Sequence, residues 1–231
     1  MIQERFKDIF INKSVAILGA GPSLKLHSNK EDITIVVNGA SSCVERYDIF
    51  MAGDVNSPKR DWWIKSLKNE NQTRIVSSYI APFDTMMYPN EEIRNYFQRE
   101  ITKFMLQNNS NPIHYVNFKP SIKPKKPHAF FTFGGMGEDI VEKISPEQDV
   151  MYWGGTISAI ALQLALISGS KDIHVYGCGF NNGSGNNYSY SCPIGQEGKT
   201  TDKQAKIMQM TIDKIRKYGV KIKIHGESVL K

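Results

Sequence analysis

The stretch from Ser14 to Lys25 constrains the fold most, because it combines a strand, a tight turn and a helix start in immediate succession. Its apolar run, Val15 to Leu18, has the length of a buried strand. Gly19 and Gly21 let the backbone turn sharply and approach a ligand, and Pro22 suits the first turn of a helix. Such a turn aims free backbone N–H groups at the space above the strand end, where an anion binds well. An ordinary strand-to-helix turn of an α/β protein explains the same residues.

Two further apolar runs have the same form as the first. The run Ile33–Val37 ends at Asn38, and the run Asp48–Ala52 ends two residues before Asp54. In open α/β sheets the ligand crevice lies outside the carboxyl ends of the strands, so Gly19, Asn38 and Asp54 are expected to converge. The glycine turn lacks the third glycine of the dinucleotide motif and the lysine of a P-loop. The sequence therefore favours a site for a single nucleotide.

The second half of the chain returns to regular structure. A helix over Thr156–Ser168 is rich in Ala, Leu and Ile on nearly all sides, which is typical of a buried helix. Its start, Gly154–Thr156, offers free N–H groups and a hydroxyl cap, and Gly169 ends it. Other predicted elements include strands over Thr73–Ser77, over Asp172–Tyr176 (followed by Gly177) and, at an edge, over Val220–Ile224, and a helix over Lys203–Tyr218.

These elements predict one nucleotide-binding domain over residues 1–231, with an α/β, Rossmann-like fold. Its mostly parallel sheet carries helices on both faces. Residues 117–150 mix prolines with Phe130–Gly137 and are predicted to form an irregular insertion that acts as a lid or an acceptor region.

Composition excludes several protein classes. No run approaches the ~20 apolar residues of a membrane span, and the N-terminus lacks the apolar stretch of a signal peptide. The three cysteines have no zinc spacing. We therefore expect a cytoplasmic protein without a transmembrane segment. The net charge of +6 suits a nucleotide phosphate, an anionic glycan, a nucleic acid or a membrane surface, so a membrane-peripheral location stays open.

Five motifs together resemble two related groups of enzymes. They are Ala16–Lys25, Asn38, Asp54, Gly154–Ser158 and Asp172–Gly177. One group is the bacterial sialyltransferases that modify lipooligosaccharide. The other contains archaeal 6-hydroxymethyl-dihydropterin diphosphokinases and the motility-accessory proteins that glycosylate flagellin. The motifs occur in the family order, over about residues 14–56 and 152–225.

The resemblance implies a Rossmann-like sheet that binds a nucleotide, with the transferred group at its carboxyl edge. In the sialyltransferases the donor is a CMP-sugar. Their nucleotide contacts correspond to Gly19, Gly21, Pro22, Ser23 and Asn38. The full predicted site also includes Ala20, Asn56, Gly154, Gly155, Thr156 and Gly177.

The resemblance also suggests catalytic residues. The asparagine that ends the third strand in sialyltransferases corresponds to Asp54 or Asn56, and an acid at Asp54 fits a diphosphokinase that holds Mg²⁺. Of two tyrosines near the leaving phosphate, one corresponds to Tyr188, whereas Asn181 occupies the other position. The family's general base is a histidine in the loop before the last helix, where this chain has none.

Glu197 is the nearest replacement for that base, since burial can raise the pKa of a carboxylate into the working range. His225, at the end of a strand, and His128, in the basic loop, are alternative bases. His174 lies in the middle of a strand and is expected to belong to the core.

The leading interpretation is a glycosyltransferase, a sialyltransferase-like transferase that uses a nucleotide-sugar of the CMP type. Its acceptor would be a hydroxyl on a glycan, a protein or a nucleic acid. The alternative is an ATP- and Mg-dependent diphosphokinase acting on a hydroxymethylpterin-like small molecule. A nucleic-acid-binding protein is a third option, supported by the basic stretch Lys119–His128 but by no recognisable nucleic-acid module. A homo-oligomer stays open.

Overall fold

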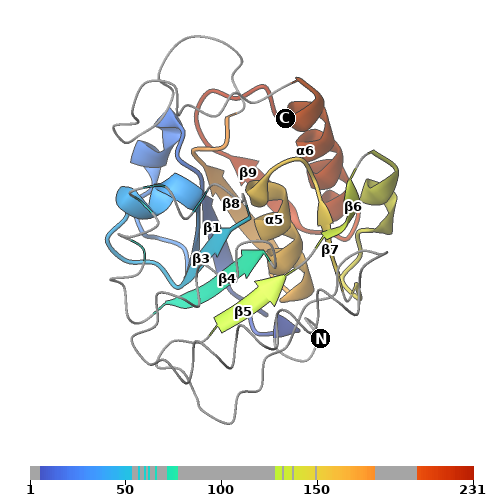
Figure 1. Cartoon of the computed structure of the whole chain (residues 1–231), viewed down its shortest axis with the longest axis horizontal. Helices are drawn as coiled ribbons and strands as arrows, with labels where there is room; N and C mark the ends of the chain where they lie inside the picture. Colours follow the sequence, from blue (N-terminus) through green and yellow to red (C-terminus); the bar gives the residue numbers. More distant parts are fainter. Residues whose placement is uncertain are drawn as a thin grey trace.

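A seven-stranded, all-parallel sheet organises the computed structural model of the chain (Figure 1). The structure describes residues 6–53, 57, 60, 62, 66, 72–77, 128–131, 133–136, 138–148, 150–179 and 202–231. The strand order is β5-β4-β3-β2-β1-β8-β9. The strands are β1 (Ser14–Leu18), β2 (Ile33–Val37), β3 (Ile49–Ala52), β4 (Thr73–Ser77), β5 (His128–Phe131), β8 (Asp172–Tyr176) and β9 (Lys221–Ile224).

Helices cover both faces of this sheet, as the sequence predicts. On one face, α5 (Ile157–Ile167) packs against β1, β2 and β3, and α6 (Asp202–Arg216) packs against α5. Three short 3₁₀ helices complete the described helices: η1 (Pro22–Leu26), η2 (Asn38–Ser42) and η4 (Glu138–Lys143). On the other face, η1 contacts β8, and η2 contacts β2 and β3.

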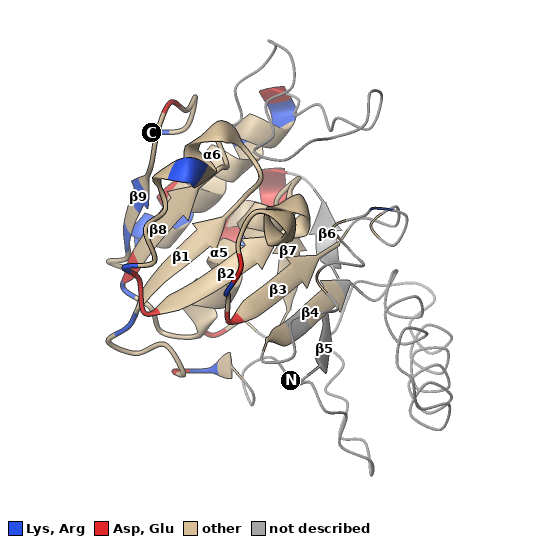
Figure 2. Ribbon diagram, turned by 90° about the vertical axis from the view of Figure 1, so that its left-hand side faces the viewer, with Lys and Arg blue, Asp and Glu red and all other residues tan. Residues whose placement is uncertain are grey.

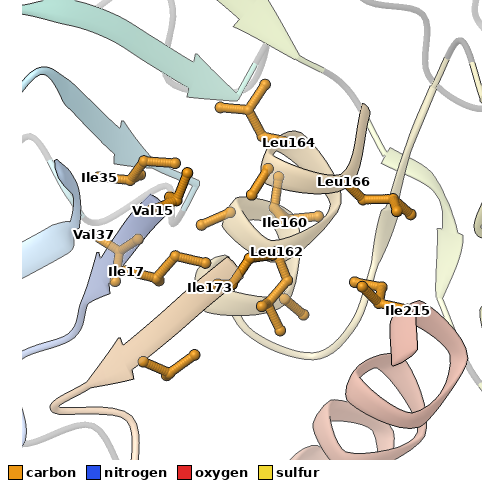
Figure 3. Close-up of a cluster of buried hydrophobic side chains, with 14 of the residues drawn as sticks. Val15, Ile17, Ile35, Val37, Ile160, Leu162, Leu164, Leu166, Ile173 and Ile215 are labelled. Atoms are coloured by element: carbon orange, nitrogen blue, oxygen red, sulfur yellow. The ribbon is translucent and has the colours of Figure 1, made fainter. Parts of the chain in front are cut away.

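Both faces of the central strands are buried, which explains their continuous apolar runs. In β1, Val15 and Ile17 belong to the core that faces α5 (Figure 3). Ala16 and Leu18 point to the opposite face because side chains alternate along a strand, and they too have no solvent exposure. The six strands predicted from such runs within the described residues are all present, with ends that agree to within one residue.

Helix α5 is the centre of the core, and its ends follow the predicted signals. All its residues, 157–167, are buried. The Thr156 hydroxyl accepts a hydrogen bond from the Ala159 N–H at 3.3 Å, which caps the first turn. Gly169 adopts a left-handed backbone, with φ 84°, and its N–H donates to the Leu166 carbonyl. Local sequence and burial therefore specify this helix together.

The stretch predicted as an irregular insertion, residues 117–150, is more regular than expected. Its described part adds β5 to the edge of the main sheet and contains β6 (Phe133–Met136), which pairs with β7 (Met151–Trp153) in a small second sheet. The prediction of irregular structure is wrong for these segments. Aromatic residues favour strands, and that preference outweighs the nearby prolines and glycines. The role of this stretch as a lid or acceptor region stays a prediction.

The edge strand β9 carries lysines on its solvent side (Figure 2). Lys221 and Lys223 are exposed, whereas Ile222 between them is buried. Charged side chains on an edge strand oppose pairing with another chain. The sequence prediction of an edge strand here is confirmed.

No helix in the part of the chain that the structure describes has both the length and the apolar composition to cross a membrane. The most apolar helix, α5, has 11 residues. A membrane-spanning helix needs about 20.

Candidate functional site

The carboxyl ends of β1 and β8 form the topological switch point of the sheet. From β1 the sheet continues through β2, β3 and β4 on one side, whereas β8 and β9 lie on the other. In open α/β sheets, ligands bind in the crevice that forms where the strand order reverses in this way. The predicted nucleotide turn, Gly19–Ser23, follows β1, and Gly177 follows β8. Both predicted turns therefore meet at the usual ligand-binding position of this architecture.

The two turns are joined by backbone hydrogen bonds. The N–H of Gly19 donates to the Tyr176 carbonyl at 2.8 Å, and the N–H of Gly21 donates to the Gly177 carbonyl at 2.8 Å. In return, the N–H of Gly177 donates to the Ser23 hydroxyl at 2.8 Å. The expectation that this turn leaves its N–H groups free is therefore wrong for Gly19 and Gly21, because the neighbouring turn already accepts from both.

The glycines are needed for this close approach whether or not a ligand binds. A Cβ atom on Gly19 would lie 2.5 Å from the Gly177 carbonyl oxygen. Gly177 itself has φ 64°, and a Cβ on it would lie 2.0 Å from the Gly19 carbonyl oxygen. Only residues without a side chain let the two backbones touch in this way. The packing of the two turns therefore explains the spacing of the glycines. Any ligand would bind on the exposed side of the turn, at Ala20 and Pro22.

Asn38 lies at the carboxyl end of β2 and is unusual in its backbone conformation and in the surroundings of its side chain. It adopts a left-handed backbone, with φ 48°, a conformation that Asn tolerates better than most residues. Its carbonyl accepts a hydrogen bond from the Ser41 hydroxyl at 3.0 Å. Its side-chain oxygen is buried and has no hydrogen-bond partner in the described part of the chain. A buried amide oxygen without a partner is costly, so this atom suits a hydroxyl or amino donor on a ligand.

The start of α5 lies beside the same switch point. The Ser158 hydroxyl, in the first turn, is 3.2 Å from the Cys178 sulfur, which directly follows Gly177. Gly155 has φ 76°, and its carbonyl accepts a hydrogen bond from the Gln204 side chain of α6 at 2.9 Å. The predicted residues Gly154, Gly155 and Thr156 are thus held between the two helices, next to the β8 turn.

Cys178 is a packing residue at this junction. Burial raises the pKa of its thiol to about 11, although hydrogen bonds with Ser158 and Gly19 act in the opposite direction. A thiol with that pKa stays protonated at neutral pH and is a poor nucleophile.

Four predicted site residues lie outside the described residues. They are Asp54, Asn56, Tyr188 and Glu197. Their roles in metal binding, phosphate contact and proton transfer stay predictions.

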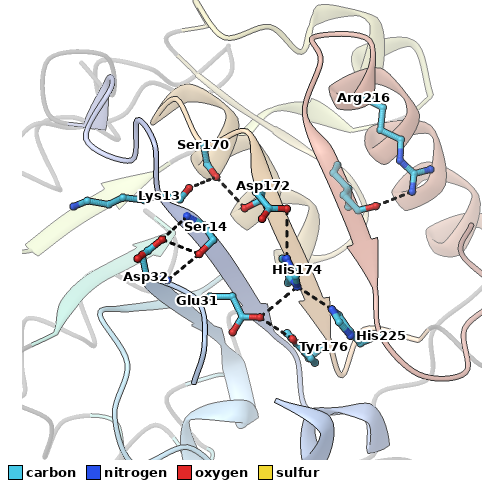
Figure 4. Close-up of polar contacts among 11 residues, drawn as sticks. Lys13, Ser14, Glu31, Asp32, Ser170, Asp172, His174, Tyr176, Arg216 and His225 are labelled. Carbon is cyan, nitrogen blue, oxygen red and sulfur yellow. Dashed lines mark hydrogen bonds and ion pairs between the residues drawn. The ribbon is translucent and has the colours of Figure 1, made fainter. Parts of the chain in front are cut away.

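A polar cluster occupies the sheet face opposite α5, beside the switch point (Figure 4). We call it the histidine cluster; its members are His27, Glu31, His174, Tyr176 and His225. The Tyr176 hydroxyl donates to the Glu31 carboxylate at 2.7 Å. The same carboxylate lies 3.3 Å from His27 and 3.3 Å from His174. The cluster therefore centres on one carboxylate that is only 5% exposed.

The geometry of the sheet explains how these distant residues meet. Ala16 of β1 is paired in register with His174 of β8 and with Thr34 of β2. Its methyl group leaves room for Glu31, which precedes β2, to reach across β1 to β8. His225 follows β9, and its N–H donates to the Val175 carbonyl, which brings its ring onto Tyr176. The ring centroids of these two residues are 4.0 Å apart, in a stacked arrangement.

The sequence patterns treat the residues of the histidine cluster one by one and do not predict that they lie together. The prediction that His174 belongs to the core is wrong, since its side chain is 22% exposed and lies on the face opposite the core around α5. The alternation of His174 and Tyr176 along β8 indicates a shared face. No sequence signal joins this pair to Glu31, because their contact depends on strand order.

The environment shifts the pKa values of the cluster. Burial lowers the pKa of His27 and of His225 below the usual value for histidine. Burial alone would raise the pKa of Glu31, but the Tyr176 hydrogen bond and the neighbouring histidines outweigh it, so this pKa is lowered. Burial and the bond to Glu31 raise the pKa of Tyr176. At neutral pH the cluster therefore holds a carboxylate, a phenol, and neutral imidazoles at His27 and His225.

The described residues contain no group of three or more His, Cys, Asp or Glu side chains that could hold a metal ion. The same holds for the histidine cluster, in which the imidazole nitrogens that contact other side chains face one another or carboxylates rather than a common point.

We compared the chain with models of protein families, with curated proteins and with solved structures, and none of these comparisons found a match.

Proposed function

We propose that the protein is a nucleotide-dependent transferase that binds a nucleotide-sugar at the switch point between β1 and β8. The buried side-chain oxygen of Asn38, without a partner in the described part of the chain, is the observation that carries this proposal. An amide oxygen at the carboxyl end of β2 fits a sugar hydroxyl or a base amino group of a nucleotide. The resemblance described above favours a CMP-sugar as the donor and a hydroxyl group as the acceptor.

The residues around the switch point would share the work of binding. The exposed side of the turn at Ala20 and Pro22 would face the nucleotide, while Asn38 fixes its orientation. The start of α5, at Gly155 and Thr156, would favour the negative charge of a phosphate. Tyr188 and Asp54 are proposed to contact the leaving phosphate. Charge on that leaving group is what a glycosyltransferase site must stabilise.

Thermal unfolding with a panel of CMP-, UDP- and GDP-sugars tests this proposal. A ligand at one hundred times its Kd stabilises the folded state by about 2.7 kcal/mol, which raises the Tm by several degrees. We expect at least one donor to produce this shift. Failure of every nucleotide to stabilise the protein would contradict the proposal.

A matched pair of variants assigns the shift to Asn38. Asn38→Gly keeps the left-handed backbone accessible and removes only the amide, so the ligand-induced shift should be lost. Asn29 also has a left-handed backbone, with φ 53°, but it is exposed and precedes the amino end of β2. Asn29→Gly should therefore keep the full shift.

The same panel, extended with ATP and Mg²⁺, distinguishes the diphosphokinase alternative. That activity requires stabilisation by ATP with Mg²⁺ and release of AMP in the presence of a hydroxymethyl compound. A transferase of sugars instead releases the nucleotide of its donor. Binding to nucleic acid through phosphates would show an affinity that falls steeply with salt.

A further inference from the structure

Two histidines of the cluster form a direct pair. The Nδ1 atom of His174 lies 3.0 Å from the Nε2 atom of His225, and the rings are stacked with centroids 5.1 Å apart. At this distance one proton lies between the two nitrogens, so one ring donates and the other accepts. The two residues therefore share a proton and form a single unit.

One end of the pair is placed to hold positive charge. His174 lies between two carboxylates, with its Nε2 3.4 Å from Asp172 and its Nδ1 3.3 Å from Glu31. Nearby opposite charges stabilise an imidazolium. When the proton between the two rings is carried by Nε2 of His225, Nδ1 of His174 is the atom that accepts it.

The other end of the pair is open. His225 is partly exposed, and its Nδ1 has no hydrogen-bond partner in the described ranges. Its ring is stacked flat on Tyr176, at 10° between planes, which fixes its orientation. The next residue, Gly226, packs against Ser23 so closely that a Cβ on it would lie 2.4 Å from the Ser23 Cβ. The residue that follows His225 therefore contacts the glycine turn of the switch point.

We propose that His225 is the general base that deprotonates the acceptor hydroxyl, with His174 as the positioning residue that receives the charge. This inference rests on the proposed function. The acceptor proton moves to Nδ1 of His225, and the shared proton moves from Nε2 of His225 to Nδ1 of His174. The acceptor oxygen forms the new bond to the sugar carbon, while the bond from that carbon to the phosphate breaks. The nucleotide leaves with that electron pair.

Charged and titratable groups face the pair from several elements. Burial is the largest cause of the lowered pKa of His225; His174 and Lys223 of β9 act in the same direction, whereas Glu31 acts against them. Asp172 on β8 and Glu31 before β2 lie 3.4 Å and 3.3 Å from the ring nitrogens of His174. Tyr176 stays a neutral phenol and contributes no charge. A base that is neutral at pH 7 and can pass a proton to a hydrogen-bonded neighbour suits general base catalysis.

Turnover of the nucleotide-sugar tests the inference, measured as release of the nucleotide with water or an added acceptor. His225→Gln should lower kcat by about 10²- to 10⁴-fold, the usual contribution of a general base, and keep the nucleotide-induced rise in Tm. His174→Gln should lower kcat less and move the acidic limb of the pH–rate profile. Lys221→Gln, an exposed change on β9, the strand that precedes His225, should leave both kcat and the pH–rate profile unchanged.

The outcomes separate the two proposals. If no nucleotide stabilises the wild-type protein, the proposed function fails and this inference fails with it. If nucleotides bind but His225→Gln keeps kcat within threefold of wild type, this inference alone is overturned. It is also overturned if Glu197→Gln shows the large loss instead. Nitrogen-15 NMR of the imidazoles tests the protonation of His225 without a measurement of turnover. A proton on Nδ1 of His225 at neutral pH, with nucleotide bound, would contradict the proposal.

Discussion

The two faces of the sheet bury different kinds of side chain. The face under α5 is filled by aliphatic residues from the strands and both long helices. The opposite face, over β8, buries a carboxylate and a tyrosine among three histidines. Apolar packing has little directional preference and depends on total volume. Polar contacts depend on specific partners, so the first face stabilises the fold and the second is the better candidate for chemistry.

Removing a side chain from the apolar face should have the largest effect on stability. Leu162 is fully buried in the middle of α5. Leu162→Ala should lower the free energy of unfolding by about 2–5 kcal/mol, through lost burial and the cavity that remains. Urea unfolding measures the change, with the exposed Lys203→Ala as a control that should stay within about 0.5 kcal/mol of wild type. A loss below about 1 kcal/mol would show that the face under α5 does not dominate stability.

The switch point joins the two faces and should be nearly as sensitive. Gly177→Ala forces a Cβ into a left-handed backbone and against the Gly19 carbonyl, which should cost about 2–4 kcal/mol. Gly219 provides the matched control, because it has φ 75° and a Cβ added to it would have no atom within 4 Å. Gly219→Ala should cost only the backbone preference, about 1–2 kcal/mol. Equal losses in the two variants would mean that the contact between the turns contributes nothing.

The apolar face was predictable from sequence, because its signals are local. Each central strand is a short apolar run that ends at glycine, asparagine or another small residue, and α5 carries its own cap at Thr156 and stop at Gly169. The edge strand β5 escaped prediction. It follows a proline-rich stretch, and only its pairing with β4 makes it a strand of the main sheet.

The candidate site was predictable only in part. The positions of Gly19 and Asn38 at strand ends can be predicted from the apolar runs that precede them. The hydrogen bond from Gly19 to Tyr176 cannot be predicted in this way, because the two residues are far apart in sequence and meet only through the order of the strands. The histidine cluster has the same origin: Glu31 and His174 meet across β1 because β8 pairs with it. Local patterns thus predict elements, whereas strand order decides which side chains share a site.

A change at Glu31 tests whether the polar face also contributes to stability. Glu31→Ala removes the acceptor of the Tyr176 hydroxyl and the partner of two histidines, so it should cost about 1–3 kcal/mol. Glu31→Gln keeps an acceptor and should cost less. The exposed Glu147→Ala is the control. If Glu31→Ala is as stable as wild type in urea, the cluster contributes no net stability and only its chemical role stays to be tested.

The smallest predicted effect is a dependence of stability on pH, which should arise from the polar face of the sheet and not from the face under α5. The pKa values of His27 and His225 are lowered in the folded state, so below about pH 6.5 the unfolded chain binds more protons than the folded one. Stability should therefore be level from about pH 8 to 7 and then fall by about 1 kcal/mol as the pH drops to about 6. Urea unfolding across this range measures the slope.

Two variants assign that slope to the polar face. Leu162→Ala should lower stability equally across this pH range, because distant sites add and burial raises the pKa values of Cys178 and Tyr152 in the core under α5, so both stay protonated. His27→Gln combined with His225→Gln should instead flatten the fall below about pH 7, because the groups whose pKa values differ between the two states are gone. An unchanged slope in the double variant would locate the proton uptake elsewhere. A steeper slope in Leu162→Ala would show that the two faces are coupled, since loosening one would then alter the protonation of the other.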